Sequence, residues 1–238
     1  MNKINEMFLL GKNFFFPRPC AACGVHLITS SEIFFGLCGQ CFRLLQNVNE
    51  ENNCLKCGKP LVSEIEICIP CRNAGVLPFE RIWVFFPYSG IYRKLLTEYK
   101  FHKNTALANF FTQKISVILN EPELLNASLV PVPVRPGKIK EKGWDQVDYL
   151  VKRLKKYSRN TISVSCCLKR KKSKIQKYLD RNGRIENLKG KIYSNEKSPG
   201  IALIIDDVMT TGSTLEVCSS VLKESGAEKV YCLSLFYD

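Results

Sequence analysis

The sequence has no run of 18 uncharged apolar residues, so it offers no segment of the kind that crosses a bilayer. Its N-terminal apolar stretches, Met7–Leu10 and Phe14–Phe16, are separated by Gly11–Asn13, and no small-residue cleavage site follows them. A secretory signal is therefore not expected. We expect a cytoplasmic protein without membrane insertion, in which a short amphipathic N-terminal helix packs on the next module.

Histidine is also scarce, with two residues in the chain. His26 lies near a cysteine pair whose metal site would already be filled by sulfur, so we interpret it as a loop residue. His102 is a lone histidine, and such residues are more often structural than catalytic. No other general base and no pocket for a base are recognisable, so we assign no catalytic residue.

Cysteine is abundant, and eight of the 12 residues form four C-x-x-C pairs separated by 14, 12 and 10 residues. Each pair places two thiolates on one turn, and two pairs complete a tetrahedral zinc site. Two structural zinc ions are predicted, because disulfides are rare in the cytosol; redox chemistry is the minor alternative. The simplest pairing is sequential, although an interleaved one stays open. The expected ligands are Cys20, Cys23, Cys38 and Cys41 for one ion, and Cys54, Cys57, Cys68 and Cys71 for the other.

The stretch from Ile201 to Thr214 organises the second part of the chain. An apolar run is followed by two carboxylates, Asp206 and Asp207, then by a loop of hydroxyl residues around Gly212 and a helical pattern. Such a loop can bind a phosphate, and the carboxylates can accept hydrogen bonds from ribose hydroxyls. The segment resembles the PRPP-binding signature of type I phosphoribosyltransferases. By this resemblance the ligand residues are Asp206, Asp207, Thr210, Thr211, Gly212, Ser213 and Thr214, with Mg²⁺ bound together with PRPP.

Strand and helix patterns alternate after Leu77, which is typical of βαβ units. We predict an α/β fold, a type I phosphoribosyltransferase-like parallel sheet with helices on both faces, over residues 77–238. A small Cys-rich zinc-ribbon module precedes it over residues 1–76. The expected strands cover residues 82–86, 129–133, 162–166, 201–205 and 229–236, and the expected helices cover about 90–100, 106–119, 145–157 and 215–225.

The charge is unevenly distributed. Residues 131–198 contain 20 Lys/Arg against 6 Asp/Glu, a local charge of +14 in a chain whose total is +13. Two clusters, residues 135–142 and 169–174, lie in predicted loops. They form either a solvated basic surface or a binding site for pyrophosphate or nucleic acid. The candidate contacts are Lys100, Arg135, Lys138, Lys142, Lys169 and Arg170. Trp144 and Tyr178 are candidates for base stacking, with a core position the alternative for Trp144.

Taken as a whole, the chain resembles the ComF family of phosphoribosyltransferase-like competence proteins. Several motifs carry this resemblance: Phe16-Pro17 before the first cysteine pair, Tyr88-Ser89-Gly90 with Arg93 and Lys100, Pro131-Val132-Pro133, and Leu168, Arg170, Gln176, Leu179, Arg184 and Asn187. The family's Arg-Gly-Phe-Asn-Gln element is replaced here by residues 142–146, Lys-Gly-Trp-Asp-Gln. By resemblance, the segment after Pro133 is the pyrophosphate loop and residues 169–187 form a mobile loop over the ligand.

Two functions follow as expectations. The resemblance implies a PRPP-binding protein of the DNA uptake machinery that interacts with incoming single-stranded DNA and with a helicase-like competence or replication-restart protein. The alternative is an active salvage or biosynthetic phosphoribosyltransferase acting on a nucleobase. The zinc module and the local charge favour the first, since binding a nucleobase requires neither.

Overall fold

The computed structural model describes residues 10–11, 13–48, 52–73, 75–159, 161–172 and 181–238. The chain forms two compact units. One consists of Met1–Asn49 and Pro87–Ile118, and the other of Glu50–Phe86 and Leu119–Asp238. Each unit thus contains two of the four cysteine pairs. The division of the sequence between residues 76 and 77 stays a prediction.

The first unit is helical. Its helices are α2 (Ser30–Phe35), α3 (Gly39–Gln46), α5 (Gly90–Lys100) and α6 (Leu107–Ile118). Aromatic side chains fill its core: the ring centroids of Phe42 and Phe110 are 5.6 Å apart, and those of Tyr99 and Phe111 are 5.3 Å apart. The predicted N-terminal helix lies partly outside the described residues. Within them, Phe14–Phe16 are largely exposed.

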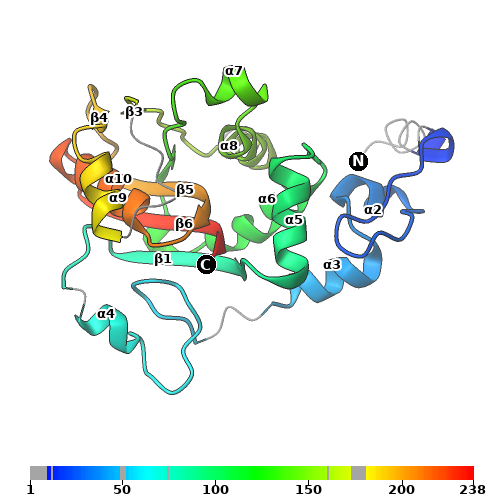
Figure 1. The fold of residues 1–238 in the computed structure, drawn as a ribbon, viewed down its shortest axis with the longest axis horizontal. Coiled ribbons are helices and arrows are strands. Elements are labelled where there is room, and N and C mark those ends of the chain that lie inside the picture. The colour runs from blue at the N-terminus through cyan, green and yellow to red at the C-terminus, as the bar shows by residue number, and fades with distance from the viewer. Residues whose placement is uncertain (1–9, 12, 49–51, 74, 160, 173–180) are drawn as a thin grey trace. The chain divides into compact units, whose positions relative to one another are not determined.

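The second unit contains a four-stranded sheet in the order β1 (Arg81–Pro87), β6 (Lys229–Tyr237), β5 (Ile201–Met209) and β2 (Ser128–Pro131). β5 pairs in parallel with both β2 and β6, and Figure 1 shows β1, β6 and β5 side by side. The remaining elements are α4 (Ile69–Asn73), the 3-10 turn Pro122–Leu124, α7 (Lys138–Lys142), α8 (Gln146–Tyr157), β3 (Leu168–Arg170), α9 (Arg181–Leu188), β4 (Ile192–Ser194) and α10 (Ser213–Glu224).

Helices cover both faces of this sheet. Ile204 and Val230 pack in one buried cluster with Leu215 and Cys218 of α10. Side chains alternate along a strand, so buried residues such as Leu203 point to the opposite face. α8 contacts β5 and β2 and covers that second face. The predicted α/β fold with a parallel sheet, preceded by a Cys-rich zinc ribbon, is confirmed.

The strand predicted over residues 162–166 is wrong. That segment makes a single parallel bridge, Leu129 to Val164, in which the N–H of Leu129 donates to Ser163 and the carbonyl of Leu129 accepts from Ser165. The next bond of a parallel ladder would need an N–H on Pro131, and proline has none. The pairing therefore stops after one bridge.

The two basic clusters, predicted as loops, contain regular structure. Residues 138–142 form α7, which begins after Gly137 at φ 88° and ends before Gly143 at φ 74°. Leu168–Arg170 form β3, which pairs antiparallel with β4. The predicted mobile loop falls partly on residues 173–180, outside the described residues, and this holds for Lys174, Gln176, Tyr178 and Leu179.

Candidate functional site

The eight cysteines of the C-x-x-C pairs form two clusters, one in each compact unit. Cys20, Cys23, Cys38 and Cys41 form the first, and Cys54, Cys57, Cys68 and Cys71 form the second. Within each cluster the sulfur atoms lie within 4.8 Å of one another. The structure thus has the sequential pairing. None of the eight forms a disulfide, and His26 belongs to neither cluster.

Both clusters fit zinc. Sulfur atoms about 2.3 Å from a tetrahedral zinc ion lie about 3.8 Å apart. The Sγ atoms of Cys23 and Cys38 are 3.7 Å apart, as are those of Cys57 and Cys68. Four sulfur ligands leave no open coordination position, so zinc at these sites is structural.

The first cysteine of each cluster is prepared to bind metal as a thiolate. The N–H of Cys38 donates to Sγ of Cys20, and the N–H of Cys68 donates to Sγ of Cys54, both at 3.3 Å. Burial raises the pKa of these thiols, but backbone N–H donors outweigh burial and lower the pKa of Cys20 and of Cys54 to about 7. The thiolate is the form that binds zinc.

The acidic pair lies near the carboxyl end of β5. Asp207 is 7% exposed and Asp206 is half-buried. The N–H of Asp207 donates to Oδ1 of Asp206 at 2.8 Å, which holds that carboxylate against the strand. The two carboxylates therefore stand at the edge of the sheet where ligands of open α/β folds bind.

The loop after the acidic pair leads into α10. Gly212 has φ 78° and ψ −6°, a left-handed conformation that favours glycine. The hydroxyls of Thr211 and Ser213 are 2.7 Å apart and hydrogen-bonded. A 12-residue helix starts at Ser213, so its N-terminal N–H groups and positive dipole end lie at this loop. The loop has the chemistry of an anion site.

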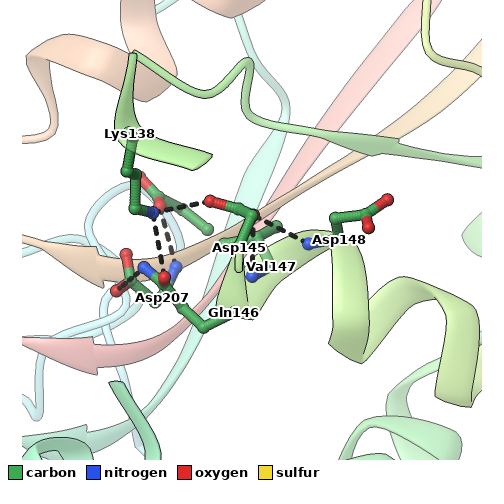
Figure 2. A network of polar contacts seen from close by, with 7 residues as sticks. Lys138, Asp145, Gln146, Val147, Asp148 and Asp207 are labelled. Carbon is green, nitrogen blue, oxygen red and sulfur yellow. Dashed lines mark hydrogen bonds and ion pairs between the residues drawn. The ribbon is translucent and has the colours of Figure 1, made fainter. Parts of the chain in front are cut away.

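A basic element reaches the acidic pair through one amide (Figure 2). Nε2 of Gln146, the first residue of α8, donates to Oδ2 of Asp207 at 2.6 Å. Nζ of Lys138, the first residue of α7, donates to Oε1 of Gln146 at 2.9 Å and to Oδ2 of Asp145 at 2.6 Å. The segment after Pro133 is therefore connected to the acidic pair by hydrogen bonds.

Comparison with known proteins finds similarity along most of the chain. Residues 12–72 match the family model described as a double zinc ribbon domain. The chain is 25% identical over 206 residues to competence protein ComFC of Streptococcus pneumoniae, which covers 84% of this chain and 86% of that protein. It is 24% identical over 225 residues to DNA utilization protein YhgH of Escherichia coli K12, an alignment that covers 91% of this chain and 96% of that protein. It is 24% identical over 226 residues to competence protein F of Haemophilus influenzae, and that alignment covers 91% of this chain and 95% of that protein. The resemblance to the ComF family is confirmed.

Asp145 stands where the ComF motif has asparagine. Its Oδ1 atom caps α8 by accepting from the N–H groups of Val147 and Asp148 at 3.0 and 2.9 Å (Figure 2). Its other oxygen pairs with Lys138. An aspartate therefore keeps the capping role that asparagine also performs and adds a negative partner for the lysine.

Among the other candidate cations, Arg170 interacts electrostatically with Asp206 of the acidic pair. Burial lowers the pKa of its guanidinium, the carboxylate of Asp206 opposes that effect, and Arg135 adds to it. Arg135 itself is exposed and forms an ion pair with Glu141. Lys169 is exposed, and its Nζ donates to the carbonyl of Cys166 at 3.1 Å.

The remaining candidates are distributed more widely. Lys100 is the last residue of α5, in the helical unit, and Lys142 is the exposed last residue of α7. His102, also in the helical unit, hydrogen-bonds through Nδ1 to Glu98 at 2.9 Å. Trp144 is half-buried and packs edge-on against Tyr149, with 5.9 Å between ring centroids. It is thus neither an open stacking platform nor a fully buried core residue.

Two features of the site were not predicted from the sequence. Gln146 belongs to a motif noted there, but no role was assigned to it, and its position at a helix start after a basic loop was the available signal. A cavity of about 620 Å³ also lies between the second cysteine cluster and the loop, lined by residues that include Pro60, Val62, Phe79, Met209 and Gly212. The segment around the second cysteine cluster therefore lines one side of a cavity, and the loop over residues 210–214, here called the anion loop, lines another.

Proposed function

We propose that the protein binds PRPP, together with Mg²⁺, at the acidic pair and the loop over residues 210–214. The observation that carries the proposal is the chain of hydrogen bonds from Lys138 through Gln146 to Asp207, which links a cation to the acidic pair through one amide side chain. In this site Asp206 and Asp207 accept hydrogen bonds from ribose hydroxyls, and the loop holds the 5′-phosphate. Lys138 and Arg170 balance the pyrophosphate charge, and Mg²⁺ enters as a counter-ion on the ligand's oxygens.

We further propose that the protein acts in DNA uptake and contacts incoming single-stranded DNA. The support is twofold. The relatives are named competence and DNA utilization proteins, and residues 131–198 carry a net charge of +14. A basic surface supplies backbone contacts to a polyanion whatever its sequence. In this role the protein works in the cytoplasm beside a helicase-like competence or replication-restart protein.

An active phosphoribosyltransferase is the second candidate. The intact acidic pair and the cations near it favour it, because departure of pyrophosphate is assisted by positive charge. No general base is assigned at the site. His102, the histidine within the expected α/β domain of residues 77–238, lies in the helical unit and hydrogen-bonds to Glu98. Binding of PRPP is common to both functions.

The proposal is tested with full-length, zinc-loaded protein. PRPP with Mg²⁺ is titrated while the melting temperature is followed, and a labelled oligo-dT is titrated in low salt. A thermal shift with DNA binding supports the DNA uptake role, and a shift with release of pyrophosphate in the presence of nucleobases supports the transferase. A deletion strain tested for transformation and for resistance to nucleobase analogues separates the same two functions in the cell. If PRPP with Mg²⁺ causes no thermal shift in wild type, both proposed functions are contradicted, because both include PRPP binding.

A further inference from the structure

Gln146 has an unusual environment for an amide side chain. It is 2% exposed, and both ends of its amide bind charged groups. An ammonium has only donors and an ionised carboxylate only acceptors, so these partners fix the amide oxygen toward Lys138 and the amide nitrogen toward Asp207. Figure 2 shows the side chain between the two. The amide therefore has one orientation.

The amide also keeps the two charges apart. Lys138 has a side chain 17% exposed and Asp207 is 7% exposed. Opposite charges that are partly shielded from water attract strongly and would form a direct ion pair if they came within contact distance. A direct ion pair would turn the cation and the carboxylate toward each other and away from a ligand. With Gln146 between them, each group is held at a distance from the other.

Asp145 fixes the same arrangement from the other side. Its side chain is 8% exposed; one oxygen caps α8, whose first residue is Gln146, and the other holds Lys138. An ammonium has three donors, and Asp145 and Gln146 bind two of them. Helix start, amide and cation are thus positioned by one carboxylate.

We propose that Gln146 is a positioning residue that joins Lys138 and Asp207 into one preassembled unit, so that a phosphate group and the hydroxyls of the same sugar phosphate are bound together. The inference rests on the proposed PRPP binding and names the residue that couples the anionic and hydroxyl ends of that ligand. Pre-organisation of this kind lowers the cost of ordering the site on binding.

The experiment measures PRPP affinity by calorimetry from about pH 5.5 to about pH 8, each variant against wild type at the same pH. Gln146→Leu removes both hydrogen bonds to charged groups, so affinity falls about tenfold or more at every pH. Gln146→Glu keeps an acceptor for Lys138 but places a second carboxylate against Asp207. At high pH the two repel and affinity falls. At low pH the pair shares a proton, the hydrogen bond returns, and affinity recovers toward wild type.

The charged groups around this position are Lys138 from α7, Asp145 at the start of α8, Asp206 and Asp207 from β5, and Arg170 from β3. All of them remain in both variants, so a relative recovery confined to Gln146→Glu reports the new carboxyl. A purely structural role for Gln146 would not give that pH profile. The test with Gln146→Glu compares the relative affinity of that one variant at low and at high pH. It therefore stays informative if Gln146→Leu fails to fold.

Lysines of α7 supply the matched control. Lys138→Met should weaken PRPP binding about tenfold or more, whereas the exposed Lys140, two residues further on, should tolerate the same change within about twofold. Equal affinity in wild type and Gln146→Leu, or no recovery of Gln146→Glu at low pH, overturns the inference while PRPP binding stands. Wild type that does not bind PRPP overturns the proposed function, and the inference falls with it.

Discussion

Gly58 lies so close to Val84 that a Cβ atom at Gly58 would stand 2.9 Å from Cγ2 of that valine. Through this contact the loop of the second cysteine cluster packs directly against β1 of the sheet. Gly24 occupies the matching place in the first cluster, after Cys23 as Gly58 follows Cys57, and a Cβ there would meet no atom within 4 Å. Both glycines have positive φ, 70° for Gly58 and 85° for Gly24.

Gly58→Ala should therefore destabilise the protein more than Gly24→Ala. Both alanines meet the strain of a left-handed backbone, about 1–2 kcal/mol. Only the alanine at position 58 adds overpacking, typically about 1–3 kcal/mol more. Calorimetric unfolding of the two variants and of wild type measures the difference. Equal losses would show that the contact between Gly58 and Val84 adjusts without cost.

Zinc removal should affect the two clusters differently. Elemental analysis of purified protein should give about two zinc ions per chain, and Cys20→Ser and Cys54→Ser should each lose one. Metal binding supplies on the order of 10 kcal/mol of folding free energy in such small modules. The second cluster packs on β1 and borders the anion loop. We therefore expect Cys54→Ser to weaken PRPP binding, and Cys20→Ser to leave it nearly unchanged. Disulfides in place of zinc would contradict this prediction.

The acidic pair should be essential for the ligand and not for the fold. PRPP at 100 times its dissociation constant stabilises wild type by about 2.7 kcal/mol. Changing Asp206 and Asp207 to Ala should abolish the corresponding thermal shift. Asp148→Ala is the control, because Asp148 is an exposed carboxylate on α8 that pairs with Lys152. A full shift in the double variant would remove the ribose from the assignment.

The sequence was sufficient for features whose chemistry is local. Four C-x-x-C pairs and one strand–carboxylate–glycine loop each lie on contiguous residues, so their spacing predicted two sulfur clusters and the loop before α10. The sequence was insufficient where a residue far away in the chain determines the local structure or the role of a side chain. The segment 162–166 has strand composition, but Pro131 on another strand stops the pairing. Gln146 acquires its role from Asp207, 61 residues away.

Single-stranded DNA binding should depend on where the positive charge lies. Lys169, Lys171 and Lys172 are exposed beside Arg170, which interacts with Asp206, while Lys152, Lys155 and Lys156 are exposed on α8. Changing either set to Ala removes three charges, so net charge is matched. We expect the 169–172 variant to bind oligo-dT more weakly and to lower the slope of log affinity against log salt by about 2, since each phosphate contact contributes roughly 0.7. The α8 variant should change both quantities less. Fluorescence anisotropy over a salt series measures both.

Equal losses of affinity in the two variants would mean that the basic region acts through its total charge alone. Should wild type fail to bind at low salt, the basic region serves pyrophosphate or a protein partner, and the transferase becomes the better proposal.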